Sequence, residues 1–216
     1  MYYPKFIKKT LNLYSEKEKM IQRAMTLLKY GGIEGDYLEF GVWEGNSFSI
    51  ACKTAKEYGL KGMRFYAFDS FEGLPETNGN DNCSVFKKGD FRCDEDRFKT
   101  NLKRQNIDLD KVITVKGWYS DILNYQLKSK LEIHRASLIM VDCDLYSSAK
   151  YVMDFITDYI QDGTVIMFDD YFCYGGSPFM GERKAFEDWL KENPDIIATE
   201  FYKFHTLGDS FVLHKR

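Results

Sequence analysis

The apolar positions of this chain fall into short runs that are separated by stretches with helical spacing. The runs at 37–42, 64–68, 112–116, 137–141 and 164–168 are rich in Val, Ile, Leu, Met and Phe. Such runs are typical of strands in a parallel sheet that is covered on both faces. The chain closes with two further strand-like segments, 198–204 and 210–214, which we expect to form a hairpin turned at Gly208-Asp209.

Helical patterns occupy the intervals between these runs. They cover 16–30, which Gly31-Gly32 ends, then 47–58, 94–102, a segment after Gly117, 148–160 and 182–191. Repeated strand–helix units predict an α/β fold with a doubly wound, mostly parallel seven-stranded sheet and an antiparallel C-terminal hairpin. We expect a single domain over 1–216, with residues 1–33 as an N-terminal helical cap and the polar segment 75–95 as a mobile lid loop.

Composition and charge narrow the class of protein. The chain has 216 residues, enough for one domain, with 44% hydrophobic and 29% charged residues. Its net charge of −3 and the lack of a basic tract disfavour a nucleic-acid partner. The five cysteines lack metal-ligand spacing and are expected as reduced thiols in a cytoplasmic protein. No apolar stretch of signal-peptide or membrane-spanning length is apparent, so no membrane association is expected.

Four carboxylates follow two of the apolar runs directly. Asp142 and Asp144 come after 137–141, and Asp169 and Asp170 come after 164–168. Because ligands bind where parallel strands end, and crowded carboxylates need a positive partner, the pattern favours a divalent cation such as Mg²⁺. The alternative is that Asp169 and Asp170 only cap the segment that follows.

The ends of the first three strands favour a nucleoside site. Gly41 and Gly45 form a G-x-x-x-G turn, which is not the G-x-G-x-x-G that seats a pyrophosphate, and Asn46 or Ser47 is positioned to cap the next helix. Asp69 lies where a carboxylate usually holds a ribose diol, although it is also a candidate turn cap. Gly117 and Trp118 are expected to border the base, unless Trp118 is simply core. The predicted nucleoside-binding residues are Glu39, Gly41, Gly45, Ser47, Asp69, Ser70, Gly117, Trp118 and Asp142.

Five segments together resemble the macrocin O-methyltransferase (TylF/MycF-type) family. They are 37–45 (YLEFGVWEG), 68–75 (FDSFEGLP), 116–121 (KGWYSD), 142–146 (DCDLY) and 168–171 (FDDY). The resemblance, which covers about 33–190, implies a class I methyltransferase that uses S-adenosylmethionine and Mg²⁺ on sugar hydroxyls of glycosylated natural products. It implies Asp142, Asp169 and Asp170 as metal ligands and Asp144 as general base. Asp144 is alternatively a helix cap, or a residue that contacts the metal ligands without binding the metal itself.

Other interpretations stay open at this point. A metal-dependent glycosyltransferase also uses a D-x-D motif, and a non-catalytic binding protein could share the fold. The three histidines, His134, His205 and His214, lie in no recognised motif and are expected to be structural. The expected partner is a small-molecule or glycoside acceptor. A sugar of an antibiotic, a sugar of a surface polysaccharide and a phenolic ring all stay open as the acceptor, and a homodimer is compatible with the sequence.

Overall fold

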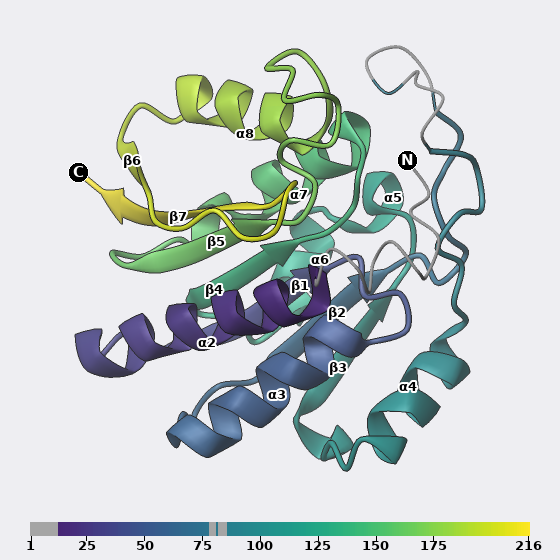
Figure 1. Ribbon diagram of the computed structural model, residues 1–216, viewed down its shortest axis with the longest axis vertical. Coiled ribbons are helices and arrows are strands. Elements are labelled where there is room, and N and C mark those ends of the chain that lie inside the picture. Colours follow the sequence, from purple (N-terminus) through teal and green to yellow (C-terminus); the bar gives the residue numbers. More distant parts are fainter. Residues whose placement is uncertain (1–12, 78–80, 82–85) are drawn as a thin grey trace.

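The computed structural model, which describes residues 13–77, 81 and 86–216, contains one sheet of seven strands. The strands are β1 (Asp36–Phe40), β2 (Phe65–Asp69), β3 (Val112–Lys116), β4 (Ala136–Val141), β5 (Thr164–Phe168), β6 (Ile196–Glu200) and β7 (Asp209–Lys215). Their order across the sheet is β3-β2-β1-β4-β5-β7-β6 (Figure 1). The first five are parallel, and β7 runs antiparallel to both β5 and β6. This confirms the predicted doubly wound sheet with an antiparallel end.

Helices connect these strands in chain order. They are α2 (Leu13–Gly31), α3 (Asn46–Tyr58), α4 (Glu95–Arg104), α5 (Tyr119–Ile122), α6 (Tyr125–Lys130), α7 (Tyr146–Ile156) and α8 (Gly181–Glu192), with 3-10 turns η2 (Leu109–Lys111) and η3 (Thr157–Tyr159). The helix predicted at 148–160 therefore begins two residues earlier, and a 3-10 turn replaces its last part. Among the described residues, no helix is long and apolar enough to cross a membrane.

The C-terminal hairpin differs from the prediction. The first strand ends at Glu200 rather than at residue 204, and Asp209 begins β7 instead of lying in the turn. Phe204 is buried and joins the core, and His205 adopts a positive φ of 42°. An extended strand cannot continue through a left-handed residue, so residues 201–208 form an irregular connection instead. That connection brings His205 to the carboxyl edge of the sheet.

Each central strand is buried on both faces. In β4, Leu138 and Met140 pack against one layer of side chains, which includes those of α2 and α3. Ile139 and Val141 pack against the other, with side chains of α7 and α8. Successive residues of a strand point to opposite faces, so both sets must be apolar when helices cover both sides. The uninterrupted apolar runs in the sequence have this cause.

Helix α2 lies beside α3 across one face of the sheet (Figure 1). Its residues Met20, Ile21, Ala24, Met25 and Leu28 are fully buried or nearly so. Their helical spacing forms one apolar stripe, which anchors the helix. The expected N-terminal cap is thus part of the main helical layer from residue 13 onward, and residues 1–12 lie outside the described residues.

The expected lid segment contacts the start of α7. The carboxylate of Asp81, which is buried, accepts hydrogen bonds from the backbone N–H of Tyr146 at 2.5 Å and of Ser147 at 3.0 Å. Asp81 thereby caps the N-terminus of α7, because the side chain of Leu145, at the N-cap position, forms no capping hydrogen bond. Residues 78–80 and 82–85 lie outside the described residues, so the mobility of this loop stays a prediction.

Candidate active site

A cavity of about 500 Å³ opens at the carboxyl edge of the sheet, between the loops that follow β1 to β5. The chain turns in opposite directions from the neighbouring strands β1 and β4, and ligands of doubly wound sheets bind at such a switch point. Both groups of predicted residues meet there: the cavity is lined by Gly41, Ser47, Asp69, Ser70, Gly117, Trp118, Asp142, Asp144, Asp169 and Asp170. Glu39 and Gly45 do not line it.

The two glycines of the first loop permit close packing between chain segments. Gly41 has a φ of 87°, and a Cβ there would lie 1.9 Å from the backbone carbonyl oxygen of Asp142. Gly45 has a φ of 83°, and a Cβ there would lie 2.9 Å from the ring of Phe98. Glycine is therefore required for conformation and for space at both positions. Gly41 brings the glycine loop against the loop that carries Asp142.

Asp69 anchors the glycine loop. Its Oδ2 accepts hydrogen bonds from the backbone N–H of Val42 at 2.8 Å and of Trp43 at 3.3 Å, and its Oδ1 accepts one from Phe71 at 2.7 Å. Burial raises the pKa of Asp69, and these three bonds oppose that effect. One carboxylate thus joins the ends of β1 and β2 and still borders the cavity.

Glu39 lies beneath the glycine loop, inside the protein. It is fully buried, and it accepts hydrogen bonds from the hydroxyls of Tyr37 and Ser47, each at 2.5 Å. Burial raises its pKa to about 8, despite those two bonds. Ser47 is consequently held by Glu39 and makes no helix cap; the cap residue of α3 is Gly45.

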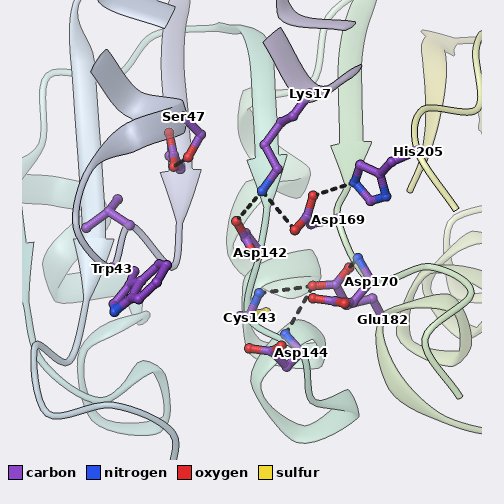
Figure 2. Close-up of polar contacts among 12 residues, drawn as sticks. Lys17, Trp43, Ser47, Asp142, Cys143, Asp144, Asp169, Asp170, Glu182 and His205 are labelled. Carbon is purple, nitrogen blue, oxygen red and sulfur yellow. Dashed lines mark hydrogen bonds and ion pairs between the residues drawn. The ribbon is translucent and has the colours of Figure 1, made fainter. Parts of the chain in front are cut away.

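The metal-type cluster predicted from the sequence does assemble. Asp142, Asp169 and Asp170 each offer a carboxylate oxygen, and these oxygens lie within 4.8 Å of one another. The ammonium group of Lys17, from α2, lies between two of them, 2.9 Å from Oδ2 of Asp142 and 2.8 Å from Oδ2 of Asp169 (Figure 2). Burial and repulsion by Asp169 raise the pKa of Asp142 to about 7, against the effect of Lys17.

Sequence reasoning missed Lys17. It precedes Met20 and Ile21 by three and four residues, so it shares the apolar stripe of α2. A lysine within an otherwise apolar helix face is the one local signal that it enters the protein. Its partner Asp142 is 125 residues away in the chain.

His205, expected to be structural, borders the cavity and contacts the acidic cluster. Its Nε2 lies 2.9 Å from Oδ1 of Asp169, and its Nδ1 accepts a hydrogen bond from the backbone N–H of Leu207 at 3.1 Å. Since Nδ1 is an acceptor, the ring proton is on Nε2 and is donated to Asp169. Burial alone would raise the pKa of Asp169, but Lys17 and His205 together lower it.

Asp144 does not point the same way as Asp142. An extended segment would place residues i and i+2 on one side, but Asp144 has a φ of 64°, in the left-handed region. Its buried carboxyl group instead lies near that of Asp170. Burial and repulsion by Asp170 raise the pKa of Asp144.

Glu182 is a further residue beside the acidic cluster that sequence reasoning did not single out. It lies in the first turn of α8 and is fully buried. Its Oε1 accepts hydrogen bonds from the backbone N–H of Cys143 at 3.0 Å and of Asp144 at 3.2 Å, and its Oε2 accepts one from Asp170 at 3.0 Å (Figure 2). In the sequence it resembles any acidic residue that complements a helix N-terminus.

The strand order β3-β2-β1-β4-β5-β7-β6, with β7 antiparallel, is that of the class I methyltransferase fold. A solved structure of the O-methyltransferase NovP aligns with a TM-score of 0.77 and 18% identity, over 93% of this chain and 80% of that one. The model of the macrocin O-methyltransferase (TylF) family matches residues 14–196. The chain therefore belongs to the macrocin O-methyltransferase family.

Two curated relatives are similar in sequence. One is the 8-demethyl-8-(2,3-dimethoxy-alpha-L-rhamnosyl)-tetracenomycin-C 4'-O-methyltransferase of Streptomyces olivaceus, 28% identical over 65% of this chain and 54% of its own length. The other is the mycinamicin III 3''-O-methyltransferase of Micromonospora griseorubida, 24% identical over 65% of this chain and 56% of its own length. The matches thus span little more than half of each relative.

Proposed function

We propose that this protein transfers the methyl group of S-adenosylmethionine to a sugar hydroxyl of a glycosylated small molecule, with Mg²⁺ at the acidic cluster. The observation that carries the proposal is that the Asp69 loop and the Asp142, Asp169 and Asp170 cluster line one cavity of about 500 Å³. Membership of an O-methyltransferase family supports the reaction. The relatives named for rhamnosyl-tetracenomycin and mycinamicin substrates support a sugar-bearing acceptor.

The donor would bind between the first three strand ends. Oδ1 of Asp69 has one backbone partner, which leaves it free to accept a ribose hydroxyl. Gly41 presents backbone without a side chain, and Ser70, Gly117 and Trp118 form the wall of the cavity nearby. Binding and orienting donor and acceptor in one cavity can supply as much as ~7–11 kcal/mol toward the transition state.

The residues of the acidic cluster fit a hard divalent cation. Three carboxylate oxygens within 4.8 Å of one another form an all-oxygen donor set, which Mg²⁺ prefers. Asp142, Asp169 and Asp170 would hold the ion. When bound, Mg²⁺ would lower the pKa of a coordinated hydroxyl and orient it.

Asp144 is the proposed proton acceptor. His205 is unsuited to that role, because Nδ1 already accepts a backbone hydrogen bond and Nε2 donates to Asp169. Asp144 lines the cavity and has a carboxyl neighbour, Asp170, rather than a cationic one. Glu182 holds the backbone of this loop through the N–H groups of Cys143 and Asp144.

Calorimetry with S-adenosylmethionine and with a nucleotide sugar tests this function. We expect heat from the first ligand alone, because the family is one of methyltransferases rather than glycosyltransferases. Methyl transfer to a glycosylated acceptor should stop with EDTA and return with Mg²⁺. Absence of S-adenosylmethionine binding would overturn the proposal. Binding without any transfer would favour a non-catalytic binding protein, and activity that is indifferent to chelation would overturn the metal's role.

A further inference from the structure

The ammonium group of Lys17 occupies the space between two proposed metal ligands. It lies within 2.9 Å of carboxylate oxygens of both Asp142 and Asp169, and the lysine side chain is only 13% exposed (Figure 2). Mg²⁺ binds carboxylate oxygens at roughly 2.0–2.1 Å. An ion that is coordinated by both of these oxygens must therefore lie in the same gap as Nζ.

Two positive groups cannot share this gap. Their direct contact in a partly buried site would be strongly repulsive, because a divalent cation and an ammonium group carry like charges and little water separates them there. The metal can bind the pair only after the ammonium group leaves.

Helix α2 itself is not free to withdraw the lysine. Met20, Ile21 and Ala24, which follow Lys17 by one to two turns, are fully buried against the sheet and α3. Moving the helix would expose this apolar stripe to water. Rotation of the Lys17 side chain is the smaller change that vacates the gap.

We propose that Lys17 is a built-in competitor of the divalent cation: it neutralises Asp142 and Asp169 when the metal is absent, and the metal must displace it. The inference rests on the proposed metal site. Lys17 then lowers the affinity for the metal while it stabilises the metal-free protein. Metal loading becomes linked to the side-chain conformation at the start of α2.

Mn²⁺ binding to the full chain, measured by calorimetry and by electron paramagnetic resonance, tests the competition. Lys17→Met should bind Mn²⁺ at least about tenfold more tightly than the unaltered protein, because no cation has to be displaced. The matched control is Lys19→Met, which removes the same charge from the same helix. Lys19 is 51% exposed and pairs with Glu16, so this variant should bind Mn²⁺ like the unaltered protein.

Thermal unfolding provides a second readout. Metal-free Lys17→Met should unfold at a lower temperature than the unaltered protein, because Asp142 and Asp169 lose their cationic partner. Saturating Mn²⁺ should raise the unfolding temperature of this variant by more than it raises that of the unaltered protein. Lys17→Gln serves the same purpose if the methionine variant does not fold. Equal or weaker Mn²⁺ affinity in both Lys17 variants would overturn the competition alone. Failure of every protein to bind Mn²⁺, with S-adenosylmethionine still bound, would overturn the metal site and this inference with it.

Discussion

Glu182 and Asp170 are joined by a hydrogen bond from the backbone N–H of Asp170 to Oε2 of Glu182, at 3.0 Å. The other oxygen of Glu182 accepts from Cys143 and Asp144, so one side chain on α8 connects the loops after β4 and β5. The distance between the carboxylates of the acidic cluster therefore depends on a residue outside both motifs. Glu182 acts as a positioning residue, since it holds backbone rather than ligand.

Glu182→Gln is expected to weaken Mn²⁺ binding and slow turnover by about tenfold or more while donor affinity stays unchanged. The amide nitrogen cannot accept a hydrogen bond, so one of the two loops loses its partner, at a cost of about 1–3 kcal/mol in the free energy of unfolding. Denaturant unfolding and calorimetry with S-adenosylhomocysteine check this. Glu187→Gln is the matched control, because it lies on the same helix and its carboxylate pairs with Arg183 instead of the two loops. An equal loss of donor affinity in Glu182→Gln would contradict the positioning role.

Substitutions at Asp142 and Asp69 should separate metal from donor. Asp142→Ala is expected to lower turnover by roughly 10³-fold, or about 4 kcal/mol of transition-state stabilisation, while donor binding persists. Asp69→Ala should weaken donor binding, since it removes the proposed ribose ligand and leaves three backbone N–H groups without their acceptor. Calorimetry and initial rates measure both. The reverse pattern would mean that the two sites have been exchanged.

Gly41→Ala is expected to be far more damaging than Gly59→Ala. Both positions have a positive φ, so each alanine carries strain of about 1–3 kcal/mol. A Cβ at Gly59 meets open space, whereas one at Gly41 would collide with the backbone of Asp142. Gly41→Ala should therefore cost roughly 3 kcal/mol or more and reduce ligand binding as well. Equal unfolding free energies of the two variants would show that the loops after β1 and β4 can separate without cost.

Glu39 makes stability depend on pH. Burial raises its pKa from an ordinary 4.5 to about 8, so the folded state prefers the protonated carboxyl group. Its contribution to stability is complete below about pH 4.5 and is lost as the pH rises through about 8. Among the charged groups, Asp142 raises the pKa of Glu39 further, and Lys17 lowers it.

The free energy of unfolding of the unaltered protein should fall more steeply over this pH range than that of Glu39→Gln. Denaturant titrations at several pH values measure both slopes. Parallel curves would indicate that the buried carboxyl group keeps an ordinary pKa in the folded protein.

The fold followed from local patterns because strand and helix periodicities are local properties of a chain. Apolar runs such as 137–141 predicted the strands. The order of the elements along the chain, together with the rules for parallel sheets, predicted that the carboxyl ends of the strands lie at one edge. Those rules also brought Asp69 and the carboxylates after β4 and β5 to one edge. The errors lay at element ends, where Phe204 and His205 depart from the strand because of core packing and backbone conformation.

What the sequence alone determined was the sheet, the family resemblance, and the carboxylates at its carboxyl edge. The tertiary structure decided what surrounds those carboxylates: Lys17 from α2, His205 from the β6–β7 connection and Glu182 from α8. It also decided that Asp144 faces Asp170 instead of sharing a side with Asp142. The physical reason is that charge compensation in a buried cluster depends on which distant elements pack against it, and no local pattern records those contacts.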